Sequence, residues 1–229
     1  MESAFRQGDL TDPTLPLPDL PLPDLRLPDL RLIETLGWDG TTFPRLDRHL
    51  DRLAASAARL GWPCDPAQVR RALRDAAPTI PARMRLTLDT KGRVEVQTAA
   101  MPAPAPFWRV SLAAARLDPA DPWLTLKSTR RAAYDGARAA LPHGIDEAIF
   151  ANDRDEVCDG SITTLFFDAG HGLCTPPLSA GLLPGVLRAQ MLGLGQCRAA
   201  PLLVDDLPRV RLWIGNSLRG LIAARWASP

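Results

Sequence analysis

Only two of the 27 basic side chains in this sequence are lysines, and one of them, Lys127, lies within the segment TLKSTRRAAYDGA. Lysine can lose its proton and attack a carbonyl carbon to form a Schiff base, whereas arginine cannot. Lys127 follows the short run PWLTL and is expected to open a helix, whose N-terminal dipole would lower its pKa. A surface lysine without chemistry is the alternative, and Lys127 alone does not decide between the two.

Lys127 needs supporting evidence, which comes from four other segments read together with its own. With the lysine segment they make five: HLDRLAASA, LKSTRRAAYDGA, EVCDGSITTLFF, TPPLSAGLLPGVLRAQML and WIGNSLRG.

In order and approximate spacing, these five segments resemble the pyridoxal-phosphate enzymes of fold type IV, the class IV aminotransferases and aminodeoxychorismate lyases. The resemblance covers most of residues 34–224. It implies pyridoxal 5′-phosphate as cofactor, with Lys127 as the catalytic residue that holds it covalently and moves protons. It also implies a homodimer, because such enzymes bury the cofactor near a subunit interface.

The resemblance further assigns cofactor-binding residues. Arg52, three residues after His49, matches the arginine that reaches the phosphate, and it lies off the leucine stripe of its helix, where it is free to reach outward. His49 borders the apolar stripe and is interpreted as structural. Asp159 matches the acid that keeps the pyridine nitrogen protonated.

Two turns would bind the phosphate. Gly185 would allow close approach, and the amides of Val186 and Leu187 at a helix start would donate to the anion. In the last segment, Asn216 and Ser217 would supply amide or hydroxyl donors.

Three positions are less regular. Asp159 stands where the family usually has glutamate, so either the backbone approaches the ring more closely or a water bridges the gap. Thr164 replaces a common asparagine, which puts a side-chain contact there in doubt. Tyr134, the only tyrosine, could touch the cofactor or only pack.

The sequence favours a 4-amino-4-deoxychorismate lyase, which makes 4-aminobenzoate and pyruvate for folate biosynthesis. The turn NSLRG is more typical of the lyases than of the aminotransferases. Arg85, Arg130 and Arg219 are candidates for binding the substrate carboxylates. An aminotransferase acting on branched-chain or D-amino acids is the alternative, and a cofactor-free relative that serves as a binding module is a third.

The elements that must position these residues fall into two groups, and the fold class expected is α+β. Residues 1–29 are predicted to be a proline-rich extended tail, since L-P-D-L repeats there. Residues 30–103 should form a small α/β domain, with a strand at 30–38, two amphipathic helices, and a hairpin around DTKG. Asp65 is the expected cap of the second helix.

The Ala-Pro steps of 99–108 predict a linker. Residues 108–229 should then form a larger, barrel-like cofactor-binding domain. Helices are expected at 128–140, 185–193 and 217–224. Strands are expected in WRVSLA, EAIFAN, ITTLFF, GLCTP, PLLVDD and VRLWIG.

Composition limits the other possibilities. A formal net charge of +1 gives no general reason to expect nucleic acid or an anionic membrane as partner. No apolar run approaches the roughly 20 residues that cross a bilayer, and the first residues lack a secretion signal, so the cytoplasm is expected. The four cysteines have no metal-ligand spacing, and no metal is expected. A small-molecule substrate remains the expected partner.

Overall fold

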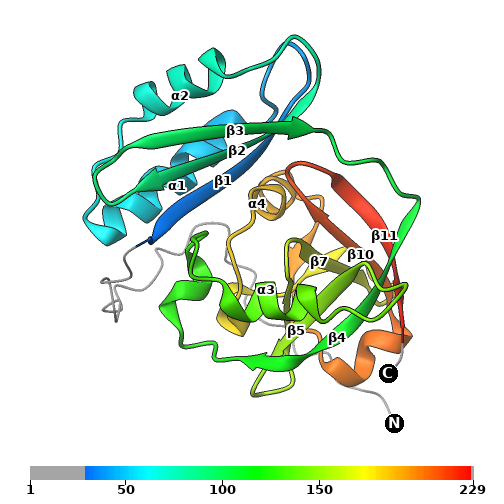
Figure 1. The fold of residues 1–229 in the computed structure, drawn as a ribbon. Coiled ribbons are helices and arrows are strands. Elements are labelled where there is room, and N and C mark those ends of the chain that lie inside the picture. The colour runs from blue at the N-terminus through cyan, green and yellow to red at the C-terminus, as the bar shows by residue number, and fades with distance from the viewer. Residues whose placement is uncertain (1–28, 228–229) are drawn as a thin grey trace.

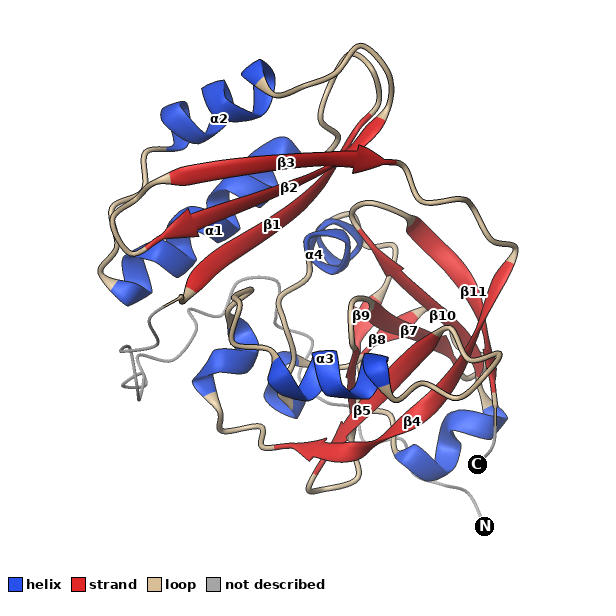
Figure 2. Ribbon diagram, viewed as in Figure 1, coloured by secondary structure: helices blue, strands red, loops and turns tan. Residues whose placement is uncertain are grey.

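The computed structural model describes residues 29–227, which form a mixed α+β structure built on two sheets (Figures 1 and 2). The predicted α+β class is confirmed. The predicted tail lies outside the described residues, except for Asp29. The division into domains at 30–103 and 108–229 stays a prediction, so we refer below to the three-stranded and the eight-stranded sheet.

The three-stranded sheet has the order β1-β2-β3 and is antiparallel throughout. Its strands are β1 (Arg31–Trp38), β2 (Ala82–Asp89) and β3 (Val94–Ala100). Along β2 the side chains of Met84 and Leu86 are fully buried, whereas Arg83 and Arg85 alternate with them and lie on the other face. One face of this sheet is therefore apolar and the other is basic.

Helices α1 (Leu46–Leu60) and α2 (Pro66–Asp75) cover the apolar face. The buried side chains of α1 include Leu50, Leu53 and Leu60, which form one stripe of the helix. Asp65 caps α2 as predicted, because its carboxylate accepts the backbone N–H of Ala67 at 2.9 Å. The strand, both helices and the hairpin expected in this part of the chain are all confirmed.

The eight-stranded sheet curls into a half-barrel with the order β6-β5-β4-β11-β10-β7-β8-β9. The pairs β4–β5, β4–β11 and β8–β9 are parallel and the other neighbours are antiparallel. The strands are β4 (Phe107–Leu117), β5 (Glu147–Asn152), β6 (Val157–Gly160), β7 (Thr164–Asp168), β8 (Cys174–Thr175), β9 (Arg198–Ala199), β10 (Arg211–Asn216) and β11 (Gly220–Trp226).

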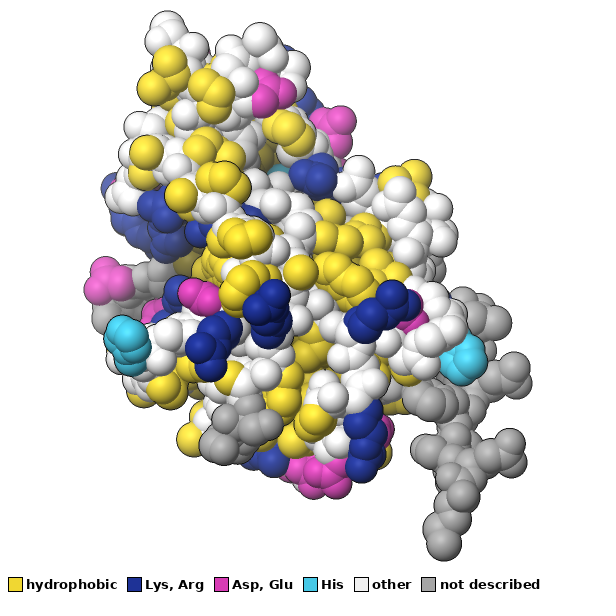
Figure 3. Space-filling view, turned by 90° about the vertical axis from the view of Figure 1, so that its right-hand side faces the viewer, with side chains coloured by type: hydrophobic (Ala, Val, Ile, Leu, Met, Phe, Trp, Pro, Cys, Tyr) yellow, Lys and Arg dark blue, Asp and Glu magenta, His cyan; other side chains and the backbone are white. Residues whose placement is uncertain are grey.

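Short helices connect these strands. They are the 3₁₀ turns η1 (Pro122–Thr125), η2 (Leu178–Ala180) and η3 (Val204–Arg209) and the α-helices α3 (Ala132–Ala139) and α4 (Val186–Gly193). In Figure 1, α4 lies between the two sheets and α3 crosses in front of the eight-stranded one. On the face that Figure 3 shows, Lys and Arg side chains gather around an apolar area.

Two predictions for the second half of the chain are wrong. PLLVDD does not form a strand: it leads into η3, where Leu207 is fully buried against the barrel core. Residues 217–224 do not form a helix, because the chain turns at Gly220, with φ +70°, and returns as β11 beside β10. Strand β6 was not predicted.

The segment that carries Lys127 pairs with the edge of the three-stranded sheet. The N–H of Ile33 donates to the carbonyl of Lys127 at 2.8 Å, and the N–H of Thr129 donates to the carbonyl of Arg31 at 2.9 Å. Leu32 and Ser128 form an antiparallel bridge between them. The backbone around Lys127 is therefore fixed by β1.

No helix within residues 29–227 has the length and apolar character that spanning a bilayer requires.

Candidate active site

A cavity of about 740 Å³ brings together side chains from both sheets. The basic face of the three-stranded sheet contributes Arg83 and Arg85, and the eight-stranded sheet contributes Asp159. Every residue predicted to bind the cofactor borders this cavity: Arg52, Lys127, Asp159, Val186, Leu187, Asn216 and Ser217. The structure thus collects in one place residues that lie up to 165 positions apart.

Lys127 lies half-buried in the cavity and not at a helix start. The predicted helix begins only at Ala132, so the expected dipole effect is wrong. Burial lowers the pKa of Lys127 to about 8, and the nearby positive charge of Arg52 adds to the effect. The nitrogen is therefore available as an uncharged nucleophile near neutral pH.

Asp159, on β6, is the acid of the site. Only 6% of it is exposed, and its Oδ1 atom has no hydrogen-bond partner within the described part of the chain. Burial raises the pKa of Asp159 well above its usual range. A buried carboxyl oxygen without a donor fits a ligand that brings an N–H of its own.

The start of α4 forms one wall. Gly185 precedes the helix with an ordinary φ of −66°, so backbone strain does not require glycine. Close packing does, because a Cβ there would lie 2.6 Å from Thr164 Oγ1. Thr164 thus takes part by packing against this turn, and the first amides of α4, at Val186 and Leu187, border the cavity.

The prediction that Arg52 reaches freely outward is wrong. Its Nε and one terminal nitrogen bind the carboxylate of Glu34 at 2.8 and 2.6 Å, and its other nitrogen donates to the carbonyl of Pro184 at 3.2 Å. Arg52 is therefore held between β1 and the turn before α4. Burial alone would raise the pKa of Glu34, but Arg52 and a bond to His49 lower it to about 2.

The turn between β10 and β11 forms a second wall. The side chain of Asn216 is occupied by this turn: its oxygen accepts the N–H groups of Leu218 and Arg219, and its nitrogen donates to the carbonyl of Ile162 at 3.1 Å. Ser217 borders the cavity, and its hydroxyl oxygen lies 2.8 Å from Nε2 of His49. Asn216 thus shapes the turn, and Ser217 presents a hydroxyl group.

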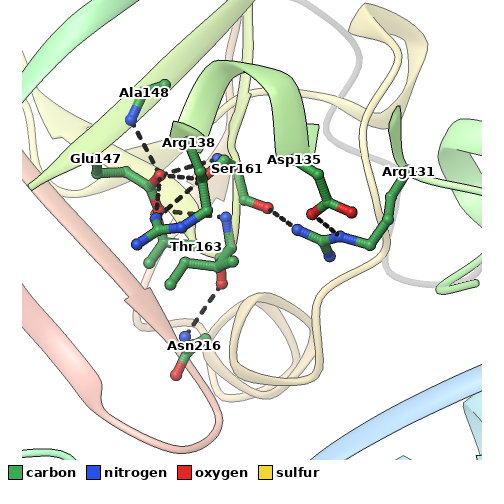
Figure 4. A network of polar contacts seen from close by, with 9 residues as sticks. Arg131, Asp135, Arg138, Glu147, Ala148, Ser161, Thr163 and Asn216 are labelled. Carbon is green, nitrogen blue, oxygen red and sulfur yellow. Dashed lines mark hydrogen bonds and ion pairs between the residues drawn. The ribbon is translucent and has the colours of Figure 1, made fainter. Parts of the chain in front are cut away.

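Glu147 was missed by sequence reasoning. It is fully buried at the start of β5, and its two oxygens accept bonds from the turn that follows Asp159, including the hydroxyl groups of Ser161 and Thr163 (Figure 4). Arg138 from α3 also donates to it at 3.2 Å. A single acid in an otherwise buried run, EAIFAN, was the available signal.

The remaining candidates differ in their partners. Tyr134 borders the cavity and packs edge-on against Phe150, and burial raises its pKa. Arg130 lies over the Trp123 ring and 3.5 Å from an oxygen of Asp121. Arg85 has no ion-pair partner within residues 29–227.

No group of three or more His, Cys, Asp or Glu side chains in the described part of the chain could hold a metal ion.

A sequence profile described as "Amino-transferase class IV" matches residues 31–225. The chain is also 31% identical over 172 residues to a predicted aminodeoxychorismate lyase of Schizosaccharomyces pombe, a match that covers 72% of this chain and 74% of that protein. The profile accounts for nearly all of the described residues.

Two solved structures are similar in fold. A predicted amino-acid aminotransferase from Mesorhizobium loti shares 43% identity with a TM-score of 0.83, covering 87% of this chain and 100% of that one. A hypothetical aminotransferase from Mycobacterium tuberculosis, solved with pyridoxal phosphate bound, has 21% identity and a TM-score of 0.72, covering 85% of this chain and 80% of that one. The predicted fold of the type IV pyridoxal-phosphate enzymes is confirmed.

Proposed function

This chain belongs to the class IV aminotransferase family, whose cofactor is pyridoxal 5′-phosphate, and on that premise we propose that it is a 4-amino-4-deoxychorismate lyase. The reaction would convert aminodeoxychorismate to 4-aminobenzoate and pyruvate. The cofactor-free alternative is not retained, because the polar groups of the cavity match the three functional ends of this cofactor.

Each end of the cofactor finds a suitable group. Lys127 offers an amine to the aldehyde, and the unpartnered oxygen of Asp159 offers an acceptor to the ring N–H. The start of α4, the hydroxyl of Ser217 and the guanidinium of Arg52 offer donors or positive charge to the phosphate. The donor set therefore fits pyridoxal phosphate.

When bound, pyridoxal phosphate supplies an electron sink that stabilises negative charge on the substrate carbon. The residues of this chain do the rest. The Nζ atom of Lys127 would take and return protons during the reaction. Asp159, once ionised, favours the protonated ring nitrogen.

The observation that favours the lyase is the NSLRG turn beside the cavity, and the basic face of β2 supports a substrate with more than one carboxylate. Arg83 and Arg85 both border the cavity, and neither makes an ion pair with any described residue. Burial and the positive charges of Arg131 and Arg83 lower the pKa of Arg85, and the negative charge of Asp135 only partly opposes this, so positive charge is in excess there. Aminodeoxychorismate carries two carboxylates, which such a cluster can bind, whereas a branched-chain amino acid carries one and an apolar side chain.

The second candidate is a class IV aminotransferase acting on branched-chain or D-amino acids. It is favoured by the 43% identity to the Mesorhizobium loti protein, which matches along its whole length. 2-Oxoglutarate, the amino acceptor in the assay below, also carries two carboxylates, so basic charge alone does not separate the reactions. The NSLRG turn, at Asn216–Gly220, favours the lyase.

In the deciding experiment, the purified holoenzyme is incubated with aminodeoxychorismate in one reaction. In the other it is incubated with 2-oxoglutarate and a panel of L- and D-amino acids. The lyase should release pyruvate and 4-aminobenzoate without any 2-oxo acid present. Amino transfer without pyruvate release would refute the lyase and establish the second candidate.

A matched pair of variants tests the basic face. Arg85→Met should lower kcat/KM for aminodeoxychorismate by roughly 10- to 100-fold, the effect of losing a hydrogen bond to a charged group. Arg71→Met, at an exposed arginine of α2 outside the cavity, should leave it unchanged. Equal activity of both variants would contradict the assignment of Arg85.

We also propose that the enzyme is a homodimer that works in the cytoplasm on a small-molecule substrate in folate biosynthesis. Family resemblance supports these points, and size-exclusion chromatography with light scattering tests the dimer.

A further inference from the structure

Three basic residues at the start of α1 and along it reach across to the phosphate end of the cavity. Arg45, His49 and Arg52 are spaced at i, i+4 and i+7, which places them on one face of the helix. Arg45 donates to the backbone carbonyl of Ser217 at 3.0 Å and to the side chain of Gln190 on α4 at 2.5 Å. One helix face therefore contacts both turns that border the phosphate end.

His49 is the central contact and is buried, with 2% exposed. Its Nδ1 atom lies 2.7 Å from a carboxylate oxygen of Glu34, and its Nε2 atom lies 2.8 Å from Ser217 Oγ. Because the low pKa of Glu34 keeps this carboxylate ionised, it can only accept, so Nδ1 must carry a proton.

The direction of the second bond depends on Nε2. If Nε2 is unprotonated, it accepts a hydrogen bond from the Ser217 hydroxyl. The hydroxyl proton is then used, and Oγ can offer only lone pairs to a ligand in the cavity. If Nε2 carries a proton, it donates to Oγ, and the hydroxyl proton is free to point at an anion. A phosphate dianion therefore favours the second arrangement, in which both nitrogens of His49 are protonated.

The charges around His49 are consistent with such a change. Glu34 on β1 is the negative partner, and Arg45 and Arg52 on α1 are positive. Lys127 and Arg219 border the same cavity from other segments. Carboxyl groups also line this cavity, at Asp118, Asp121, Asp135 and Asp159, but the carboxylate bonded to His49 is that of Glu34. A bound phosphate dianion would supply the further negative charge that a second proton on His49 requires.

We propose that the Glu34–His49 pair orients the Ser217 hydroxyl as a donor to the phosphate of bound pyridoxal phosphate, and that binding this phosphate is accompanied by proton uptake at His49. His49 is thus a positioning residue that acts through Ser217. The inference rests on the proposed placing of Ser217 at the phosphate end, and not on the lyase reaction.

The experiment titrates apoprotein by calorimetry with pyridoxal phosphate and with pyridoxal, each in two buffers of different ionisation enthalpy. Proton exchange at Lys127 is common to both ligands, so the difference between them reports the phosphate end. Measurement above pH 7.5 keeps the free phosphate largely dianionic, since its second pKa is about 6. The wild-type protein should take up more protons with pyridoxal phosphate than with pyridoxal.

Four variants define the source of this difference. His49→Ala should lower the ratio of the affinity for pyridoxal phosphate to the affinity for pyridoxal roughly tenfold, as expected for one hydrogen bond to a charged group. Ser217→Ala should have the same effect. The double variant should fall no further than either single variant. His49→Gln, which offers a permanent amide donor, should keep most of the ratio but lose the extra proton uptake.

Retained pyridoxal binding serves as the folding control for each variant. An equal proton count for the two ligands in the wild-type protein would overturn the proposal, as would an unchanged affinity ratio in Ser217→Ala. Either result leaves pyruvate release from aminodeoxychorismate as an independent test of the lyase, so the two failures can be told apart.

Discussion

The low pKa of Lys127 predicts how fast the apoprotein captures its cofactor at different pH values. Its pKa is lowered from 10.5 to about 8. At pH 7 about 10% of an amine with this pKa is uncharged, against about 0.03% of an ordinary lysine, a gain of roughly 300-fold in the reactive form. The rate constant for capture should rise about tenfold per pH unit below pH 8 and level off above it.

The assay is stopped-flow absorbance of apoprotein mixed with pyridoxal phosphate, followed by borohydride reduction and peptide mapping. Lys91 is the matched control, since it is exposed at the β2–β3 turn. Lys91→Arg should keep the full profile, and Lys127→Arg should abolish capture. Arg52→Met should move the midpoint upward, because a neighbouring positive charge is removed. A rate that keeps rising to about pH 10, or a label at Lys91, would refute the reasoning.

Three further predictions concern the buried charges. Lys127→Met should stabilise the apoprotein by up to about 3 kcal/mol at pH 7, measured by urea unfolding. The cause is that the pKa of Lys127 in the folded protein lies below its unfolded value of 10.5. The stability gained over the wild-type protein is therefore full below pH 8 and disappears as the pH rises past 10.5. Asp159→Asn should retain pyridoxal phosphate but lose roughly 100-fold in kcat, and unchanged turnover would show that the ring nitrogen has another partner. Glu147→Gln should lower the free energy of unfolding by about 3 kcal/mol, whereas Glu95→Gln, at an exposed side chain, should change it by less than about 1 kcal/mol.

Local patterns predicted the three-stranded half of the molecule well. The leucine stripe of α1 and the Asp65 cap of α2 are set by residues within a few positions of one another, and the structure agrees with both. PLLVDD failed because a short apolar run does not distinguish a strand from a buried turn, and here Leu207 enters the barrel core from η3.

The candidate site was predicted only in part. The residues predicted to bind the cofactor were chosen through segment resemblance, and all of them border one cavity. Glu34 and Glu147 escaped notice because their importance lies in partners distant in sequence: Glu34 contacts Arg52 on α1, and Glu147 contacts Arg138 on α3 and the turn after β6. Such contacts exist only once the sheets are assembled.

The pairing of the Lys127 segment with β1 has a consequence for motion. Lys127 belongs to a segment attached to one sheet, and Asp159 belongs to the other sheet. A cofactor bound to both side chains would link the two sheets. The amide protons of Ile33 and Thr129, which bond across the Lys127 segment, should then exchange with deuterated solvent more slowly in the holoenzyme than in the apoprotein.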